Sequence, residues 1–317
     1  MDKLRVAVVG IGFWGRNHVR VLNEIDEAEV VAVCDIDKQR ANAIAERMGI
    51  NAYTNTAEML KREALDAVTI CVWSTSLAKE AIRALKADKH IFVEKPMARS
   101  SKEAMRVIEL AKQKNRIVEV GFIERFNPAV RRLKSMIKDG RIGSVVSAMV
   151  RRVSKWPERI GDVGVIKDTA IHDIDIMRYI FDEDPVAVYA KAGRLRHKRF
   201  EDYAQIMLAF SEGRTAFIEA NWLTPYKVRR LVVTGSEAII SLDYITQEIT
   251  IETREETITP REEWREPLKL ELQHFVSCVL EGKEPLVTGL DGLKALMIAE
   301  AALKSARRCS VVRLRLP

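Results

Sequence analysis

The sequence predicts an α/β protein in two domains. Residues 1–121 should form a doubly wound parallel sheet, and residues 122–317 an α+β domain with a large, mainly antiparallel open sheet. Two observations carry this prediction. The first part alternates apolar strand-like runs with helical segments, which is typical of parallel sheets. The second part has a series of strand-like runs separated by turn signals such as Ser211-Glu212-Gly213, which is typical of antiparallel meanders.

In the first part, each expected strand is apolar on both faces and a helix follows it, so helices should cover both sides of the sheet. Asp37 is a candidate cap for one helix, with Gly49 as its stop, and Ser100 with Glu103 forms a capping box for another. The expected strands are 6–10, 30–34, 67–72, 90–93 and 117–121, and the expected helices are 14–24, 37–48, 77–86 and one from 100.

In the second part, the runs expected to form strands are 144–153, 186–192, 203–210, 214–220, 228–234, 238–242 and 248–252. Helices are expected over 128–138, 168–181, 268–281 and 291–305. Such an open sheet leaves one face bare, and self-association is the usual cover. We therefore expect a homodimer or homotetramer.

Composition and charge narrow the class of protein. The chain has 317 residues, 47% of them apolar, without a leader-like start or an apolar run of bilayer length, so a cytoplasmic protein with no membrane partner is expected. The formal net charge is +7, and the basic clusters at 151–152, 194–200, 229–230 and 307–308 are scattered along the chain. This pattern argues against a nucleic-acid partner and suits a small anionic ligand.

The N-terminal stretch "VAVVGIGFWGRNH" places Gly10, Gly12 and Gly15 as GxGxxG between a strand and a helix. Glycines there allow a tight turn and a close approach of the backbone to a pyrophosphate, as in Rossmann domains. Asp35 ends the next strand, where a carboxylate binds ribose hydroxyls and repels a 2′-phosphate, so NAD is predicted over NADP. A turn or cap residue is the alternative for Asp35. The predicted cofactor-binding residues are Gly10, Gly12, Phe13, Trp14, Gly15, Asp35, Ile36, Ser74, Glu94 and Lys95.

Two further motifs carry reactive groups. "HIFVEKPMA" puts Lys95 at the end of a strand, the ligand-binding edge of an open α/β sheet. "DTAIHDIDIMRYIF" is a mostly apolar helix on which Asp168, His172, Asp175 and Tyr179 fall at i, i+4, i+7 and i+11, and therefore on one face. We expect that polar stripe to face the reacting molecule.

The combination resembles the Gfo/Idh/MocA oxidoreductases, the glucose–fructose oxidoreductase and inositol dehydrogenase family. The resemblance covers essentially the whole chain and rests on "GIGFWGRNH", "VEKPMA", "GFIERFNP" and "DTAIHDIDIMR". It implies NAD-dependent hydride transfer from a sugar or cyclitol carbon, without a metal, with Lys95, Asp168 and His172 as catalytic residues. The side-chain chemistry agrees, because histidine is a suitable base for the hydroxyl proton and an ammonium stabilises alkoxide character.

The polar residues of this helix allow alternative roles. Asp175 either serves the substrate or pairs with a basic residue. A structural Asp–His pair or a metal site made from Asp168, His172 and Asp175 would also fit the stripe. The chain departs from many family members at "VWSTSLAKEA", where Trp73 stands near the place of a proline and no histidine follows.

The stretch "KWPERIGDVGVIKD" bears on the substrate, since arginines hold phosphates and aromatic rings stack on bases. It looks most like members that oxidise the 3-hydroxyl of UDP-N-acetylglucosamine or its uronic acid. The alternatives are a myo-inositol or free aldose dehydrogenase and a non-catalytic dinucleotide-binding regulator. Trp156 as a core anchor and Arg159 as a solvated charge are the structural alternatives. The expected substrate-binding residues are Arg125, Asn127, Trp156, Arg159, Asp168 and His172.

Overall fold

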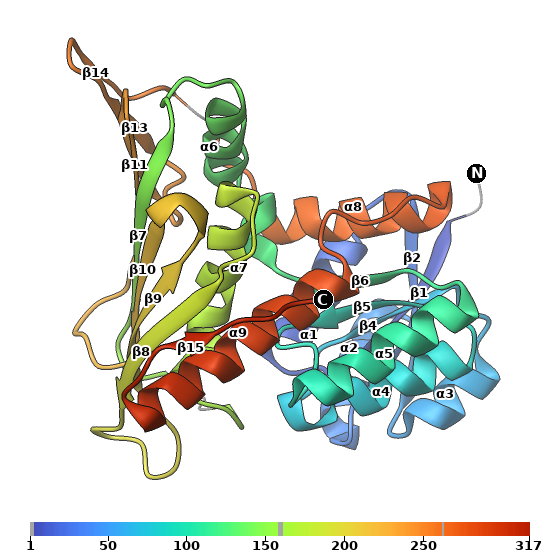
Figure 1. The fold of residues 1–317 in the computed structure, drawn as a ribbon. Helices are drawn as coiled ribbons and strands as arrows, with labels where there is room; N and C mark the ends of the chain where they lie inside the picture. The colour runs from blue at the N-terminus through green and yellow to red at the C-terminus, as the bar shows by residue number, and fades with distance from the viewer. Residues whose placement is uncertain (1–2, 158–160, 262) are drawn as a thin grey trace. The chain divides into compact units, whose positions relative to one another are not determined.

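The computed structural model describes residues 3–157, 161–261 and 263–317, which form two compact units (Figure 1). Unit 1 comprises residues 1–122 and 268–293, and unit 2 comprises 123–267 and 294–317. The first boundary lies one residue from the expected position. The expectation that all of 122–317 forms one domain was wrong, because residues 268–293 return to unit 1.

Long-range contacts explain this return. The Val120 amide donates to the Val287 carbonyl at 3.2 Å, and Glu119 and Thr288 form an isolated antiparallel bridge. Phe275 of helix α8 (Pro267–Glu281) meets Phe92 edge to face, with ring centroids 5.7 Å apart. These partners are far apart in the chain, so the order of elements alone does not reveal the insertion.

Unit 1 contains a six-stranded, all-parallel sheet in the order β3-β2-β1-β4-β5-β6, which confirms the Rossmann-type prediction. Helix α8 lies on one side of this sheet and α4 and α5 lie on the other (Figure 1). The elements are β1 Leu4–Val9, α1 Phe13–Leu22, β2 Ala28–Cys34, α2 Lys38–Met48, β3 Asn51–Tyr53, α3 Thr56–Arg62, β4 Ala67–Ile70, α4 Ser74–Lys86, β5 His90–Glu94, α5 Ser101–Lys114 and β6 Val118–Gly121.

The predicted helix caps are present. The Asp37 side chain accepts from the Arg40 amide, and Gly49 ends α2 in the left-handed region at φ 68°. The Ser100 hydroxyl accepts from the Glu103 amide at 3.3 Å. Strand β3 was missed because it has three residues, none of them buried, and so lacks an apolar run.

Unit 2 contains a nine-stranded sheet in the order β14-β13-β12-β11-β7-β10-β9-β8-β15. Every neighbouring pair in it is antiparallel except β7 with β10, so the prediction of a mainly antiparallel sheet is confirmed. Its strands are β7 Val145–Val153, β8 Ala187–Gly193, β9 Tyr203–Ala209, β10 Thr215–Asn221, β11 Val228–Gly235, β12 Ile239–Asp243, β13 Ile249–Glu252, β14 Thr257–Ile258 and β15 Val312–Arg313. Its helical elements are the 3₁₀ turns η1 Ile123–Phe126 and η3 Ser211–Gly213, the π-helix η2 Ile166–Ala170, and helices α6 Pro128–Lys138 and α7 Ile171–Phe181.

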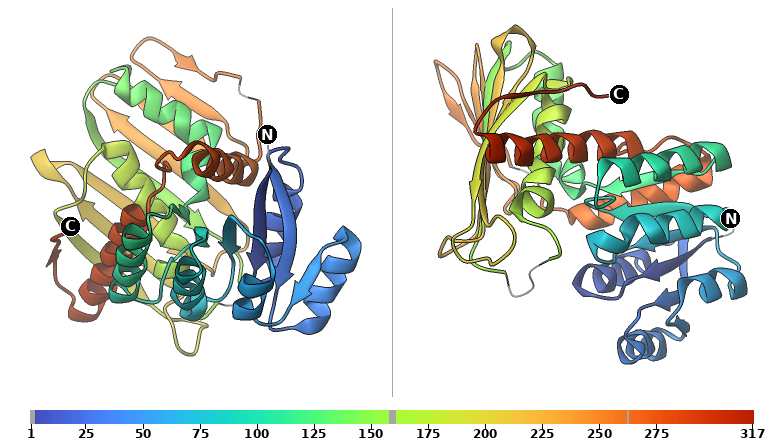
Figure 2. Two further views of the ribbon diagram at one scale, coloured as in Figure 1. Left: turned by 90° about the vertical axis from the view of Figure 1, so that its right-hand side faces the viewer. Right: turned by 60° about the horizontal axis from the view of Figure 1, so that its bottom comes forward.

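Helices α6 and α7 pack on one face of this sheet, and Figure 2 shows the same arrangement from two further sides. The other face presents Met149 and Phe217, which are paired in register on β7 and β10 and are 61% and 48% exposed. No helix in the described part of the chain is both long enough and apolar enough to cross a membrane. Helix α9 (Gly289–Arg308) begins in unit 1 and ends in unit 2.

Candidate active site

In unit 1 the predicted cofactor residues follow strands of the parallel sheet. The glycine turn follows β1, Asp35 follows β2, and Lys95 follows β5. Carboxyl ends of parallel strands lie at one edge of a sheet, so these groups share that edge. Open α/β sheets bind their ligands there.

The turn between β1 and α1 requires glycine at two positions. Gly10 has φ +89°, and a Cβ on it would lie 2.8 Å from the Cys71 backbone. A Cβ on Gly15 would lie 1.8 Å from the Gly10 carbonyl oxygen. Glycine is therefore required for the tightness of this turn and for the close packing of α1 against it, which is the geometry of a pyrophosphate-binding turn.

Asp35 is buried and held in place by its neighbours. Its Oδ2 accepts from the Ile11 amide at 2.6 Å, and its Oδ1 accepts from the Asp37 amide at 2.9 Å. The Arg40 guanidinium lies 3.3 Å from Oδ2. No arginine directly follows Asp35 in the sequence, and this one comes from the first turn of α2.

The other predicted cofactor residues differ in exposure. Phe13, Trp14 and Ile36 are 61%, 39% and 90% exposed, whereas Ser74 is buried at the start of α4. Gly12 is the N-cap of α1 and provides no side-chain cap. The first turn of α1 therefore keeps free the amide groups that an anion would use.

Glu94 is the last residue of β5, and Lys95 follows it. The Glu94 carboxylate meets His18 of α1, with 3.0 Å between Oε1 and Nε2. It also lies against Gly121, where a Cβ would be 3.2 Å from both carboxylate oxygens. Lys95 is half-buried and follows directly, joined to Pro96 by a cis peptide bond. The rigid Glu94 thus fixes the chain beside the candidate catalytic lysine.

In unit 2, the expected helix begins as the π-helix η2, which contains Asp168, and continues as α7, which contains His172. Both side chains are half-buried, as is Tyr179. The Thr169 hydroxyl lies 3.3 Å from an Asp168 carboxylate oxygen and accepts from the Trp222 indole at 2.9 Å. Both residues were missed, although Thr169 stands inside "DTAIHDIDIMR", because the hydrogen bond between them joins segments that are far apart in the chain.

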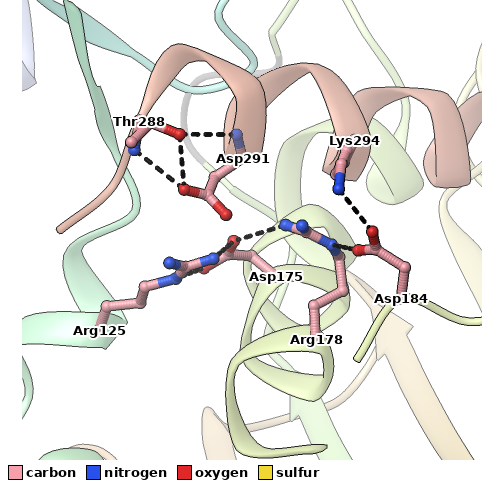
Figure 3. A network of polar contacts seen from close by, with 7 residues as sticks. All are labelled: Arg125, Asp175, Arg178, Asp184, Thr288, Asp291 and Lys294. Carbon is pink, nitrogen blue, oxygen red and sulfur yellow. Dashed lines mark hydrogen bonds and ion pairs between the residues drawn. The ribbon is translucent and has the colours of Figure 1, made fainter. Parts of the chain in front are cut away.

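Asp175 is more buried than Asp168, His172 and Tyr179, with which it was expected to share one face of the helix. It is fully buried, and its two oxygens accept from Arg125 at 2.7 and 2.6 Å (Figure 3). Arg178 follows at 3.7 Å from Asp175 and binds Asp184 at 2.6 Å, and Asp184 binds Lys294. Of the two alternatives for Asp175, the structure supports pairing with a basic residue.

This pairing also bears on two expected substrate-binding residues. Arg125 is 5% exposed, and its guanidinium is held by Asp175 and stacked on Tyr179. Asn127 is fully buried, caps α6 by accepting from the Ala129 amide, and donates to the Tyr244 carbonyl at 2.9 Å. Both side chains are engaged inside unit 2, which favours structural roles over direct contact with substrate.

A second buried pair stands beside His172. Asp173 accepts from Arg152 at 2.8 and 2.9 Å, and Arg152 also donates to Glu124 at 2.9 Å. Burial raises the pKa of Asp173, and Arg152 opposes that shift. The pair fixes the first turn of α7, which carries His172.

Trp156 lies near the same part of unit 2. Its ring centroid is 6.3 Å from that of Trp222, at an interplanar angle of 88°, and the Arg196 guanidinium lies 4.7 Å above the ring. Trp156 is half-buried and therefore not a core anchor. Arg159 lies outside the described residues.

Comparison with known proteins identifies the family. Residues 4–122 match the model of the oxidoreductase family with an NAD-binding Rossmann fold, and residues 130–241 match the GFO/IDH/MocA C-terminal domain. The chain belongs to the Gfo/Idh/MocA oxidoreductase family. It is an NAD-dependent dehydrogenase that acts on CH–OH groups of a sugar or polyol.

Curated relatives in the family match along nearly the whole chain. Scyllo-inositol 2-dehydrogenase (NAD(+)) from Bacillus subtilis is 31% identical and covers 98% of this chain and 96% of its own. Myo-inositol 2-dehydrogenase from Thermotoga maritima is 29% identical, with 98% of both chains covered. Both relatives are inositol dehydrogenases by name, and neither name mentions a UDP-sugar.

Solved structures confirm the fold. Levoglucosan dehydrogenase in complex with NADH and levoglucosan superposes with a TM-score of 0.92 at 22% identity and covers 98% of this chain and 99% of its own. Aldose-aldose oxidoreductase from Caulobacter crescentus superposes with a TM-score of 0.91 at 23% identity and covers 99% of this chain and all of its own.

Proposed function

We propose that the protein oxidises a secondary ring hydroxyl of a cyclitol or sugar to a ketone, with an inositol as the first candidate substrate. The observation that carries the proposal is the pair of half-buried side chains Asp168, in η2, and His172, in the first turn of α7, in a chain of this family. The inositol dehydrogenases among its relatives support the choice of inositol.

NAD, when bound, accepts the hydride from the ring carbon. The chain's own residues do the rest of the proposed work. The glycine turn lets the backbone approach the pyrophosphate, and Asp35 accepts hydrogen bonds from the adenosine ribose. Phe13, Trp14, Ile36, Ser74 and Glu94 are the other residues proposed to contact the cofactor.

His172 is proposed as the base that takes the hydroxyl proton, because an imidazole titrates near neutral pH. Lys95 stabilises the developing alkoxide through its ammonium group. Asp168 orients the imidazole or binds a neighbouring ring hydroxyl, and Thr169 holds its carboxylate. The proposal requires Lys95 and His172 to act on the same substrate molecule.

A nucleotide-linked sugar is the second candidate. Trp156, under the Arg196 guanidinium, supplies an aromatic ring and a cation of the kind that bind a base and a diphosphate. This observation favours UDP-N-acetylglucosamine or its uronic acid, with Arg159 as a further proposed contact.

Product analysis tests the proposal. The purified protein is incubated with NAD and, separately, with myo-inositol, scyllo-inositol, glucose, UDP-N-acetylglucosamine and its uronic acid, with and without 2-oxoglutarate to recycle the cofactor. Mass spectrometry should detect loss of two hydrogens from one substrate. Loss from an inositol or glucose supports the first candidate, and loss from a UDP-sugar supports the second. No oxidation of any ring would contradict the proposal.

Asp35 should set the preference for NAD. We expect NADH to bind more tightly than NADPH, because the buried carboxylate repels a 2′-phosphate. Asp35→Asn should reduce that preference by about tenfold, whereas Asp37→Asn, in the neighbouring cap position, should leave it unchanged. Fluorescence titration with both cofactors measures the ratio. Tighter binding of NADPH by the unaltered protein would overturn this assignment.

We propose that a second copy of the chain covers the apolar face of the nine-stranded sheet around Met149 and Phe217. Light scattering should give a dimer or tetramer, and Phe217→Glu should shift the mass toward the monomer. A monomeric unaltered protein would contradict the proposal.

A further inference from the structure

Five strand termini of unit 2 form a single row. Gly193 pairs with Tyr203, Tyr203 with Asn221, Asn221 with Val153, and Val153 with Val228. The segments that leave this row are therefore neighbours at one end of the nine-stranded sheet. They are 154–157 after β7, 194–202 between β8 and β9, and 222–227 between β10 and β11.

These segments place basic residues that are far apart in the sequence at one end of the sheet. The basic clusters at 194–200 and 229–230, which are scattered in the sequence, lie at the same end of this sheet. Arg196 lies in the β8–β9 loop, Lys227 precedes β11, and Arg229 is the second residue of that strand. We call Arg196, Lys227 and Arg229 the strand-end cluster.

Around Lys227 and Arg229, basic side chains outnumber the carboxylates that pair with them. Arg229 lies directly opposite Arg152 in the β7–β11 register, and like charges in that position repel. Arg152 donates to both oxygens of Asp173 and also to Glu124, at 2.9 Å. Arg229 is left with a contact of 3.6 Å to the same Glu124 oxygen. Two carboxylates thus balance the charges of two guanidinium groups, and the Lys227 ammonium adds a third positive charge.

Burial and the excess of positive charge lower the pKa of both Lys227 and Arg229. Burial lowers the pKa of Lys227, and the positive charges of Arg229 and Arg152 lower it further. Burial also lowers the pKa of Arg229, and Arg152 adds to that effect. Asp168 is among the carboxylates whose charge acts on Arg229. An additional anion at this place would relieve the repulsion.

The loop that carries Arg196 is rigidly held. Asp202 is buried and accepts from the amides of Leu195, Arg196 and His197 at 2.7 to 3.1 Å. The His197 ring accepts from the amides of Arg199 and Phe200. In the part of unit 2 that the structure describes, Arg196 makes no ion pair and is exposed above Trp156. The loop is fixed while its cations point outward.

A chain of contacts connects this loop to the proposed catalytic helix. Trp156 meets Trp222 edge to face, the Trp222 indole donates to Thr169, and Thr169 contacts Asp168. The Arg196 end of the cluster is therefore joined to Asp168 through three side chains within unit 2.

We propose that the strand-end cluster binds a phosphate or diphosphate group carried by the substrate whose ring is oxidised beside Asp168 and His172. This inference rests on the proposed oxidation of a ring hydroxyl and adds that the cyclitol or sugar ring carries a phosphate group. A single carboxylate would leave most of the positive charge unused, whereas phosphoryl oxygens accept from several arginine and lysine donors at once. An uncharged cyclitol would not use the cluster.

Binding provides a test that does not depend on turnover. The full-length protein with NADH bound is titrated calorimetrically with inorganic pyrophosphate and with uridine diphosphate. Lys227→Met and Arg196→Met should each weaken binding by about tenfold to a hundredfold, because each removes a charge-assisted contact. Arg230→Met is the matched control, since Arg230 adjoins Arg229 on β11 but pairs with Asp243 and is 72% exposed. It should bind like the unaltered protein.

Pyrophosphate distinguishes a phosphate site from a site that also needs the nucleoside. A phosphate site binds both probes, whereas a site that needs the nucleoside binds uridine diphosphate and not pyrophosphate. If neither probe binds the unaltered protein, or if Lys227→Met and Arg196→Met bind both as well as Arg230→Met does, the inference is wrong.

Kinetics separate this inference from the proposed function. Matched pairs of substrates are compared: myo-inositol with its 1-phosphate, and N-acetylglucosamine with its UDP derivative. We expect kcat/KM to be higher for one phosphorylated member, and Lys227→Met to lower only that value. Equal kcat/KM for the free and phosphorylated rings would refute the phosphate subsite while leaving the dehydrogenase intact. Probe binding without oxidation of any ring would support the subsite and contradict the proposed reaction.

Discussion

His172→Ala is expected to lower kcat by about a hundredfold to ten-thousandfold, which is the usual contribution of a general base. NADH should still bind, because the glycine turn and Asp35 belong to unit 1 and are unchanged. Steady-state kinetics and cofactor titration on the same preparation measure both effects. A variant that keeps more than about a third of the turnover would show that another group takes the proton.

Tyr179→Phe is the matched control for His172→Ala. Tyr179 lies two turns further along α7, is also half-buried, and packs its ring against Arg125 and Lys134. Removing only its hydroxyl should leave kcat within about twofold and thereby show that a change on α7 alone does not abolish turnover.

Asp175→Ala is expected to destabilise unit 2 by about 3–5 kcal/mol, because it leaves the Arg125 charge buried without its partner. Denaturant unfolding followed by tryptophan fluorescence measures the change. Asp184→Ala should cost less, since the Asp184 side chain is 30% exposed and Arg178 keeps a second carboxylate, Asp175, at 3.7 Å. Equal losses in the two variants would mean that burial of the Arg125–Asp175 pair is not what makes it important.

The double variant Arg125→Met with Asp175→Leu should recover much of the stability, because it removes both charges together. Recovery together with normal kcat would also confirm that neither side chain is needed for chemistry. Direct contact of Arg125 with substrate would instead appear as a raised KM in the stable double variant.

The fold was largely predictable because local patterns specify it. Apolar runs between capped helices predicted the parallel sheet, and alternation with turn signals predicted the antiparallel one. The assignment of α8 to unit 1 was not predictable, since it depends on contacts such as Phe275 with Phe92 that no local pattern encodes. Short edge strands such as β3 were missed for want of an apolar run.

For the site, sequence predicted residues that stand in motifs at strand ends, such as Gly10, Asp35 and Lys95. It left two alternatives for Asp175, and burial against Arg125 decides between them. Thr169 and Trp222 escaped detection because their bond joins segments 53 positions apart. Arg196 and Arg229 looked scattered because antiparallel connections bring distant segments to one end of a sheet.

Transfer of a deuterium label tests the central claim most directly. The substrate found by product analysis is prepared with deuterium on the ring carbon that bears the reacting hydroxyl, and the NADH formed is analysed by mass spectrometry. Direct hydride transfer predicts NADH that is heavier by one deuterium, with none of the label in water. Unlabelled NADH with the deuterium in solvent, or a ketone formed without reduction of NAD, would contradict the claim.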